Sequence, residues 1–194
     1  MSLVKKTPWI FALAASSTFC TAAVISVDSF GGDGLGFTFE TAALTPGVVG
    51  LFNFTSAPQD PAGFFASYTA NQLGITTLDN TNSFPDASGT RFAAEVEFSD
   101  GVVSDGETVF VAVGDGSTFA DSVGVTLFEF VASQQPTNPG AQERLAPFSP
   151  TADAIVAPSF GSVSGTTLEL QPVPEPSTGL LAFAGLALAL RRKR

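Results

Sequence analysis

The strongest constraint on the fold is an alternation of apolar and polar side chains with a period of two in the middle of the chain. In RFAAEVEFS, residues 91–99, one side of an extended backbone carries Phe92, Ala94, Val96 and Phe98, and the other side carries Glu95 and Glu97. A period of two fits a β-strand with one buried face and does not fit a helix, whose period is about 3.6 residues. The sequence therefore predicts a half-buried strand at these positions.

Other apolar runs predict further strands. In ETVFVAV, residues 107–113, Phe110 and Ala112 lie opposite three alternating valines, so both faces of that strand are expected to be covered. No run has the spacing of an amphipathic helix, so AGFFASY is also interpreted as a strand. Together with AGFFASY at residues 62–68, the further strand candidates are mostly rich in Val, Phe and Thr. They cover residues 24–30, 36–40, 48–55, 75–78, 122–132, 154–157 and 166–170.

Clusters of Gly, Pro, Asn, Asp and Ser separate these runs, as expected of turns between strands. The region 24–172 is about 150 residues long, which suits one domain with a sizeable core. Many short strands at this spacing predict an all-β fold, and we expect a single antiparallel β-sandwich of jelly-roll or Greek-key type. No internal repeat is apparent, so a solenoid or a propeller is disfavoured.

One segment of this region interrupts the strand pattern. Residues 133–153 contain four prolines and few strand formers, which predicts a long excursion across the surface before the last strand. Arg144 lies in this segment, and we expect it to form an ion pair with a neighbouring carboxylate.

The N-terminal end differs in composition from the middle of the chain. Lys5 and Lys6 precede an apolar stretch, and small residues lie at positions 21–23, so residues 1–23 are expected to form a cleavable secretory signal peptide. Phe19 precedes Cys20, which disfavours a lipoprotein signal. Cleavage after Ala23 would remove the single cysteine, and the mature chain would then have no disulfide.

The C-terminal end combines an apolar run with a basic cluster. Residues 179–190 carry no charge, but twelve residues are few for a membrane core that takes about 20. The run is apolar on every face, which disfavours the alternative of a core helix with a basic cap. A marginal, transient membrane helix is therefore expected. The basic cluster would hold the extreme C-terminus in the cytoplasm, and it consists of Arg191, Arg192, Lys193 and Arg194.

Within residues 173–194, Pro174, Glu175 and Pro176 are followed by the apolar run and then by the basic cluster. This arrangement resembles the PEP-CTERM sorting signal of Gram-negative bacteria. It implies recognition of these three residues by an exosortase-type membrane protease and removal of the tail. It also implies release or attachment in an extracellular polysaccharide matrix. With the signal peptide, this indicates export by the Sec machinery and transient anchoring in the inner membrane, and it implies nothing about the fold upstream.

Charge excludes one class of function. Between positions 24 and 172 there are two basic residues, Arg91 and Arg144, and seventeen acidic ones, which gives a formal charge of −15. Such a domain repels nucleic-acid phosphates and favours solubility and cations. Nucleic-acid binding is not expected.

The residue inventory also argues against catalysis. The chain has no histidine, which excludes Ser-His-Asp and Cys-His nucleophile systems and histidine-zinc sites. Paired carboxylates for glycoside hydrolysis remain formally open. However, residues 24–172 contain no tryptophan and one tyrosine, Tyr68, to stack on a sugar. We therefore expect no catalytic residues and no resident cofactor.

Four Asp-Gly pairs, beginning at residues 33, 100, 105 and 115, are candidates for chemistry. Tight hairpin turns explain such pairs, because glycine readily adopts the positive φ that these turns require. The alternative is calcium, since SDGVVSDGE brings Asp100, Asp105 and Glu107 close in sequence, although the spacing of an EF-hand is absent.

Taken from the sequence, the expected function is a non-catalytic structural or adhesive role at the cell surface or in the extracellular matrix. The alternatives are a module that binds calcium or carbohydrate and, third, a secreted glycoside-acting enzyme. Calcium-dependent stabilisation would favour the binding module, and hydrolysis of a polysaccharide would favour the enzyme.

Overall fold

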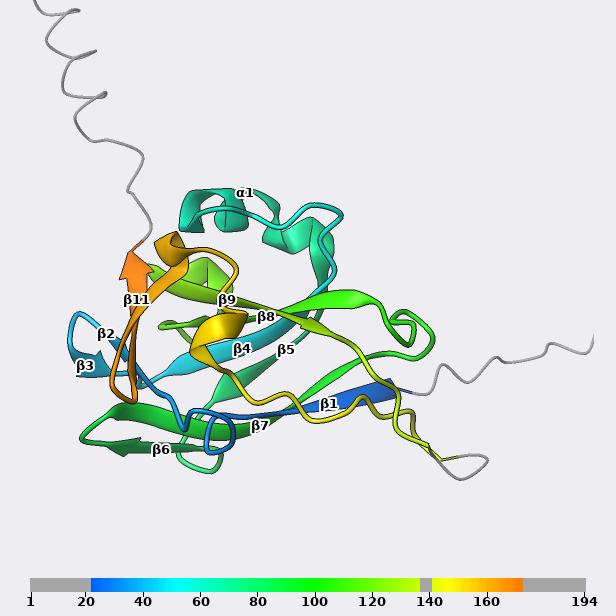
Figure 1. Cartoon of the computed structure of the whole chain (residues 1–194), viewed down its shortest axis with the longest axis horizontal. Helices are drawn as coiled ribbons and strands as arrows, with labels where there is room; N and C mark the ends of the chain where they lie inside the picture. The colour runs from blue at the N-terminus through cyan, green and yellow to red at the C-terminus, as the bar shows by residue number, and fades with distance from the viewer. Residues whose placement is uncertain (1–21, 137–140, 173–194) are drawn as a thin grey trace, which may run out of the picture.

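The computed structural model describes residues 22–136 and 141–172, and in this part of the chain β-strands dominate (Figure 1). The all-β class predicted from alternation is thereby confirmed. In chain order the elements are β1 (Ala22–Asp28), β2 (Gly36–Phe39), β3 (Ala42–Ala43), β4 (Gly47–Phe52), α1 (Pro61–Asn71), β5 (Gln72–Leu78), β6 (Ser83–Asp86), β7 (Gly89–Ser99), β8 (Thr108–Gly114), the 3₁₀ turn η1 (Phe119–Asp121), β9 (Gly124–Val131), the 3₁₀ turns η2 (Ala152–Ala154) and η3 (Pro158–Phe160), β10 (Gly161–Ser164) and β11 (Thr167–Pro172).

These strands form one hydrogen-bonded sheet in the order β1-β7-β2-β11-β9-β8-β4-β5. Outside this order, β10 pairs with β11, β3 with β2 and β6 with β7. The sheet is open and strongly curled, so that β5, at one end of this order, returns to β7 (Figure 1). Gly74 permits this approach, because a side chain there would collide with the carbonyl oxygen of Glu97. The sequence predicted a sandwich; the described strands show one sheet curled by its twist, and the jelly-roll or Greek-key sandwich is not confirmed.

Two apolar clusters lie on opposite faces of β4, β8 and β9. Inside the curl, Val111 of β8 packs in the same cluster as Ile25 of β1 and Val96 of β7. Outside the curl, Phe110 of β8 belongs to a second cluster that includes Phe64 of α1. The prediction that both faces of the strand at 107–113 are covered is therefore confirmed. In β7, the residues Phe92, Ala94, Val96 and Phe98 are buried and Glu95 and Glu97 are exposed, as predicted.

The helix α1 corrects the strand predicted at residues 62–68. Asp60 caps its N-terminus, with Oδ1 accepting a hydrogen bond from the Gly63 amide at 2.7 Å, and Pro61 occupies the first turn. Pro61 and Phe64 are the buried residues of the helix. Because only this narrow stripe faces the sheet, the apolar residues of the segment do not recur clearly with the helical period. The aromatic content that indicated a strand was outweighed by these local signals for the start of a helix.

The strand predicted at 154–157 is also wrong. Ala154 ends the turn η2, and Ile155 forms only a single isolated bridge to Phe128 of β9. Ile155, Val156 and Ala157 pack against the outer apolar cluster, and Ala154 and Ile155 pack against the inner one.

Within the predicted excursion at 133–153, residues 143–148 lie along the open edge of β1, where the yellow segment runs beside the blue strand (Figure 1). We call residues 143–148 the edge segment. The Val24 amide donates to the Glu143 carbonyl at 3.0 Å, and the Phe148 amide donates to the Ser26 carbonyl at 2.9 Å. The expected ion pair of Arg144 is confirmed, since its Nη2 lies 3.2 Å from Oε1 of Glu95. The edge segment therefore covers backbone groups that an edge strand would leave open.

Within residues 22–136 and 141–172, no helix has both the length and the apolar character that a membrane crossing requires. Nearly all of the predicted signal peptide, and the whole apolar run at 179–190, lie outside the described residues. Ala22 and Ala23 are described and belong to β1.

Candidate functional site

The predicted sorting motif begins where the folded sheet ends. In β11, Gln171 pairs with Val125 and Pro172 with Gly124 of β9. Only Val173 separates Pro172 from Pro174 in the sequence. The end of β11 (orange) lies on the side of the molecule opposite to the start of β1 (Figure 1). The motif residues Pro174, Glu175 and Pro176 and the basic cluster at 191–194 lie outside the described residues.

A pair of carboxyl groups lies where the edge segment meets the turn after β7. Oε2 of Glu143 accepts a hydrogen bond from the Gly101 amide at 3.2 Å, and Oε1 accepts one from Nε2 of Gln134. The hydrogen bond between the Glu143 and Asp100 carboxyl groups, together with partial burial, raises the pKa of Glu143 above its ordinary value. This contact makes the attachment of the edge segment sensitive to protonation.

The three calcium candidates are engaged in separate contacts. Oδ1 of Asp105 accepts a hydrogen bond from the Gln134 amide at 2.8 Å. Oε1 of Glu107 accepts one from Nδ2 of Asn53 at 2.6 Å, and Asp100 contacts Glu143. Among residues 22–136 and 141–172, no group of three or more His, Cys, Asp and Glu side chains is placed to hold a metal ion. The structure does not bring these candidates together as a calcium site.

The Asp-Gly pairs act in turns. Gly101 and Gly106 have φ values of +73° and +79°, which confirms the expectation that these glycines supply left-handed backbone. At the fourth pair, Oδ1 of Asp115 accepts hydrogen bonds from the amides of Val123 and Gly124 at 2.9 and 2.8 Å. That carboxylate joins the end of β8 to the start of β9.

A pair of exposed aromatic rings forms the clearest candidate for binding. Phe30 and Phe84 are 48% and 49% exposed, and their rings meet edge to face with centroids 5.6 Å apart. They are the two exposed phenylalanines of the residues that the structure describes. Oδ1 of Asp28 holds the Phe30 amide at 2.8 Å, which fixes the position of this residue.

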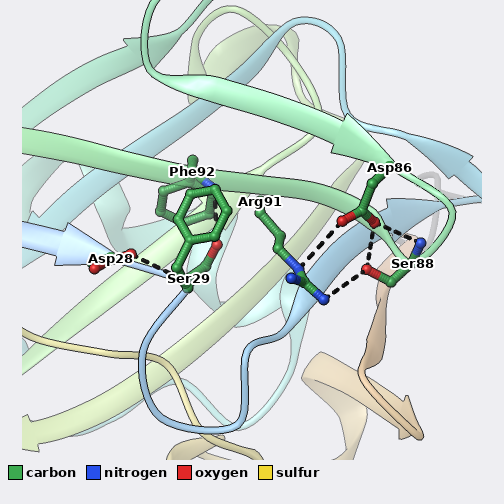
Figure 2. A network of polar contacts seen from close by, with 7 residues as sticks. Asp28, Ser29, Asp86, Ser88, Arg91 and Phe92 are labelled. Atoms are coloured by element: carbon green, nitrogen blue, oxygen red, sulfur yellow. Dashed lines mark hydrogen bonds and ion pairs between the residues drawn. The ribbon is translucent and has the colours of Figure 1, made fainter.

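Arg91, one of the two cations of the domain, lies beside this pair. It is opposite Phe84 in the pairing of β6 with β7. Its Nε lies 3.5 Å from Oδ2 of Asp86, and its Nη2 donates to Oγ of Ser88 at 3.4 Å (Figure 2). The hydrogen bonds from Ser88, and then the charge of Arg91, lower the pKa of Asp86. We call Phe30, Phe84 and Arg91 the aromatic surface.

Sequence reasoning missed the aromatic surface. Phe30 and Phe84 are far apart in the chain and resemble the other phenylalanines, most of which are in the core. The local signal at Phe84 was its position between Ser83 and Pro85, in a short segment that makes an edge strand.

A shallow groove of about 380 Å³ lies where η2 and the following residues cross β9. Glu129 of β9 and Asp153 of η2 contribute carboxylates to its lining, and Phe130 and Val131 contribute apolar surface. Such a groove can accept a neutral or cationic group, and its carboxylates disfavour an anionic one.

Comparison with known proteins bears on the C-terminus. The family model of the PEP-CTERM protein-sorting motif matches residues 172–194. No curated protein and no solved structure matches the chain. The chain thus carries a PEP-CTERM motif, which implies export and sorting by an exosortase to the cell envelope or surface. The match starts at Pro172, the last residue of β11.

Proposed function

We propose that this protein has a non-catalytic structural or adhesive role in the cell envelope or in a polysaccharide-containing extracellular matrix. The sorting-motif match at residues 172–194, directly after the folded sheet, is the observation that carries the proposal. In this proposal, the Sec machinery exports the chain, the apolar run holds it in the inner membrane for a time, and an exosortase-type protease removes the tail.

The chemistry of the domain supports a structural role. Its formal charge of −15 between residues 24 and 172 keeps exported copies soluble and apart. Carboxylates that could have served a ligand instead hold turns together, as Asp115 and Asp86 do. The apolar residues are mostly in two large clusters around β4, β8 and β9, so stability comes from burial rather than from a disulfide.

Processing in the native host tests the sorting part of the proposal, namely export followed by removal of the tail. Mass spectrometry is expected to show an N-terminus near Val24 and a chain that lacks Arg191, Arg192, Lys193 and Arg194. Replacing Pro174, Glu175 and Pro176 by alanine is expected to leave export intact and to trap the protein in the inner membrane. Recovery of the intact basic end on most surface molecules would contradict sorting by cleavage.

The aromatic surface favours a second candidate, a carbohydrate-binding module. Exposed rings present apolar area to the CH faces of a sugar, and Arg91 supplies donors for hydroxyl groups. The domain charge of −15 favours a neutral glycan over an anionic one.

Binding of soluble neutral glucans by the region 24–172 tests this candidate. Phe30→Ala with Phe84→Ala is expected to abolish retention in affinity electrophoresis. Val123→Ala removes an exposed apolar side chain that lies outside both the aromatic surface and the groove at β9, and it serves as the control. Equal retention of both variants, or none for the unaltered domain, would reject the candidate.

A further inference from the structure

The C-terminal end of β11 is held in the interior of the sheet order. β2 and β10 pair with the preceding residues of this strand, 167–169 and 167–170, whereas Gln171 and Pro172 pair with β9 alone. Leu168 and Leu170 are buried, whereas Gln171 is half-buried and Pro172 is exposed. The strand therefore has a firmly packed part, up to Leu170, and a two-residue end that only its pairing with β9 holds in place.

In the sequence, few residues separate this end from the apolar run at 179–190. If the tail enters the membrane at Ser177, residues 173–176 are the whole connection to Pro172. Four extended residues cover at most about 14 Å. The sorting motif occupies that connection, so a folded domain and a membrane surface would flank it closely on both sides.

A protease needs its substrate backbone extended and accessible, and folded segments become accessible through local opening. We propose that release of Gln171 and Pro172 from β9 is the step that admits the processing enzyme to the motif, so that the folded domain sets the rate of its own processing. The inference rests on the proposed function, in which such an enzyme cleaves the tail.

The contacts at the strand end define how far it can open. Pro172 has no amide hydrogen to lose from the sheet. Release of two residues adds about 7 Å of free chain. Opening beyond Leu170 would expose the buried side chains of Leu170 and Leu168, which belong to the inner core. Opening is therefore confined to Gln171 and Pro172.

A spacer is the direct test. In the full-length chain in its native host, Gly-Ser-Gly-Ser is inserted between Pro172 and Val173, and loss of the tail is followed by pulse-chase. Processing is expected to become about tenfold faster, because release of the strand end from β9 is no longer required. The matched control carries the same insertion after Gly101, in a turn with open space around this residue.

A lock at the strand end is the converse test. Gln171 and Val125 are partners in an antiparallel pair, at a separation that a disulfide can bridge. Gln171→Cys with Val125→Cys is expected to slow processing about tenfold or more when oxidised, and a reductant is expected to restore the rate. Each single variant reports any effect of the substitution itself, including misfolding from the loss of buried Val125.

The outcomes separate this inference from the proposed function. An unchanged rate with the spacer would overturn the inference. A slower rate would overturn it too, since the enzyme would then depend on the domain face next to the motif. If the unaltered chain and the variant with alanines at 174–176 both keep the tail, processing itself is absent and the proposed function fails.

Discussion

At the scale of single residues, the contact between Glu143 and Asp100 links the surface of this domain to pH. A carboxyl group with a raised pKa binds its proton more strongly in the folded state than in the unfolded one. Its contribution to stability is full below the unfolded pKa, near 4.5, and is lost as the pH rises through the higher folded value. Asp79 and Asp86, whose pKa values are lowered, act in the opposite direction below 3.8.

Glu143→Gln is expected to reduce the loss of stability as the pH rises above 4.5, since the variant has no carboxyl proton to lose at this position. Thermal melts between pH 4 and pH 7 are the measurement. The unaltered domain should melt at a lower temperature at pH 7 than at pH 5, and the variant should show a smaller difference in melting temperature between these two pH values. A variant with the same pH dependence as the unaltered domain would show that the pair is unimportant.

Val111→Asp is expected to unfold the domain. Val111 is completely buried at the centre of β8, so the substitution places an unpaired charge in the inner core at a cost of more than about 4 kcal/mol. Urea unfolding followed by circular dichroism measures the effect. Val131→Asp, on the exposed part of β9, is the control and should change the free energy of unfolding by less than about 0.5 kcal/mol.

At the scale of elements, alternation predicted β7, β8 and β9 because the period of a strand is visible within one short segment. The helix α1 was missed because its starting signal, Asp60 followed by Pro61, is a single local cue in an aromatic stretch. The order of strands and the curl were not predictable, since they depend on pairings such as β2 with β11, which join residues far apart in the chain.

The same distinction applies to the candidate sites. The sorting motif is contiguous and was predicted in full, whereas the aromatic surface joins side chains from two distant segments. Closeness in sequence does not fix the direction of side chains around a turn. The structure therefore does not bring together the calcium candidates Asp100, Asp105 and Glu107, each of which contacts a different partner.

Asp60→Ala tests the origin of α1. The loss of the cap is expected to lower the free energy of unfolding by about 1 kcal/mol, equivalent to about 2–4 °C in melting temperature. Thr69→Ala, at an exposed position of the same helix, should not lower it, because alanine is the better helix former. Equal losses in both variants would contradict the assignment of Asp60 as the cap.

At the scale of the whole molecule, the formal charge of −15 between residues 24 and 172 governs the response to salt. Any salt should stabilise the domain by screening the repulsion between its carboxylates, and the effect should depend on ionic strength rather than on the cation. A specific calcium site would differ, adding about 2.7 kcal/mol at a hundredfold excess over its dissociation constant.

Thermal melts in calcium, magnesium and sodium chloride at equal ionic strength are therefore expected to coincide. Asp105→Asn should have little effect, since an asparagine oxygen can still accept the hydrogen bond from the Gln134 amide. A large shift with calcium alone that Asp105→Asn abolishes would refute this expectation and favour a calcium-binding module.

The parallel pairing of β11 with β2 also determines when the domain can fold during export. Residues 167–169 pair with residues 36–38, so β2, near the N-terminus, can form this pairing only after β11, the last strand, has been delivered. A chain that crosses a membrane from its N-terminus would have delivered nearly all of the domain before this pairing could form. Contacts between such distant segments are slow to form, so the complete sheet should form only when translocation of the chain is almost finished.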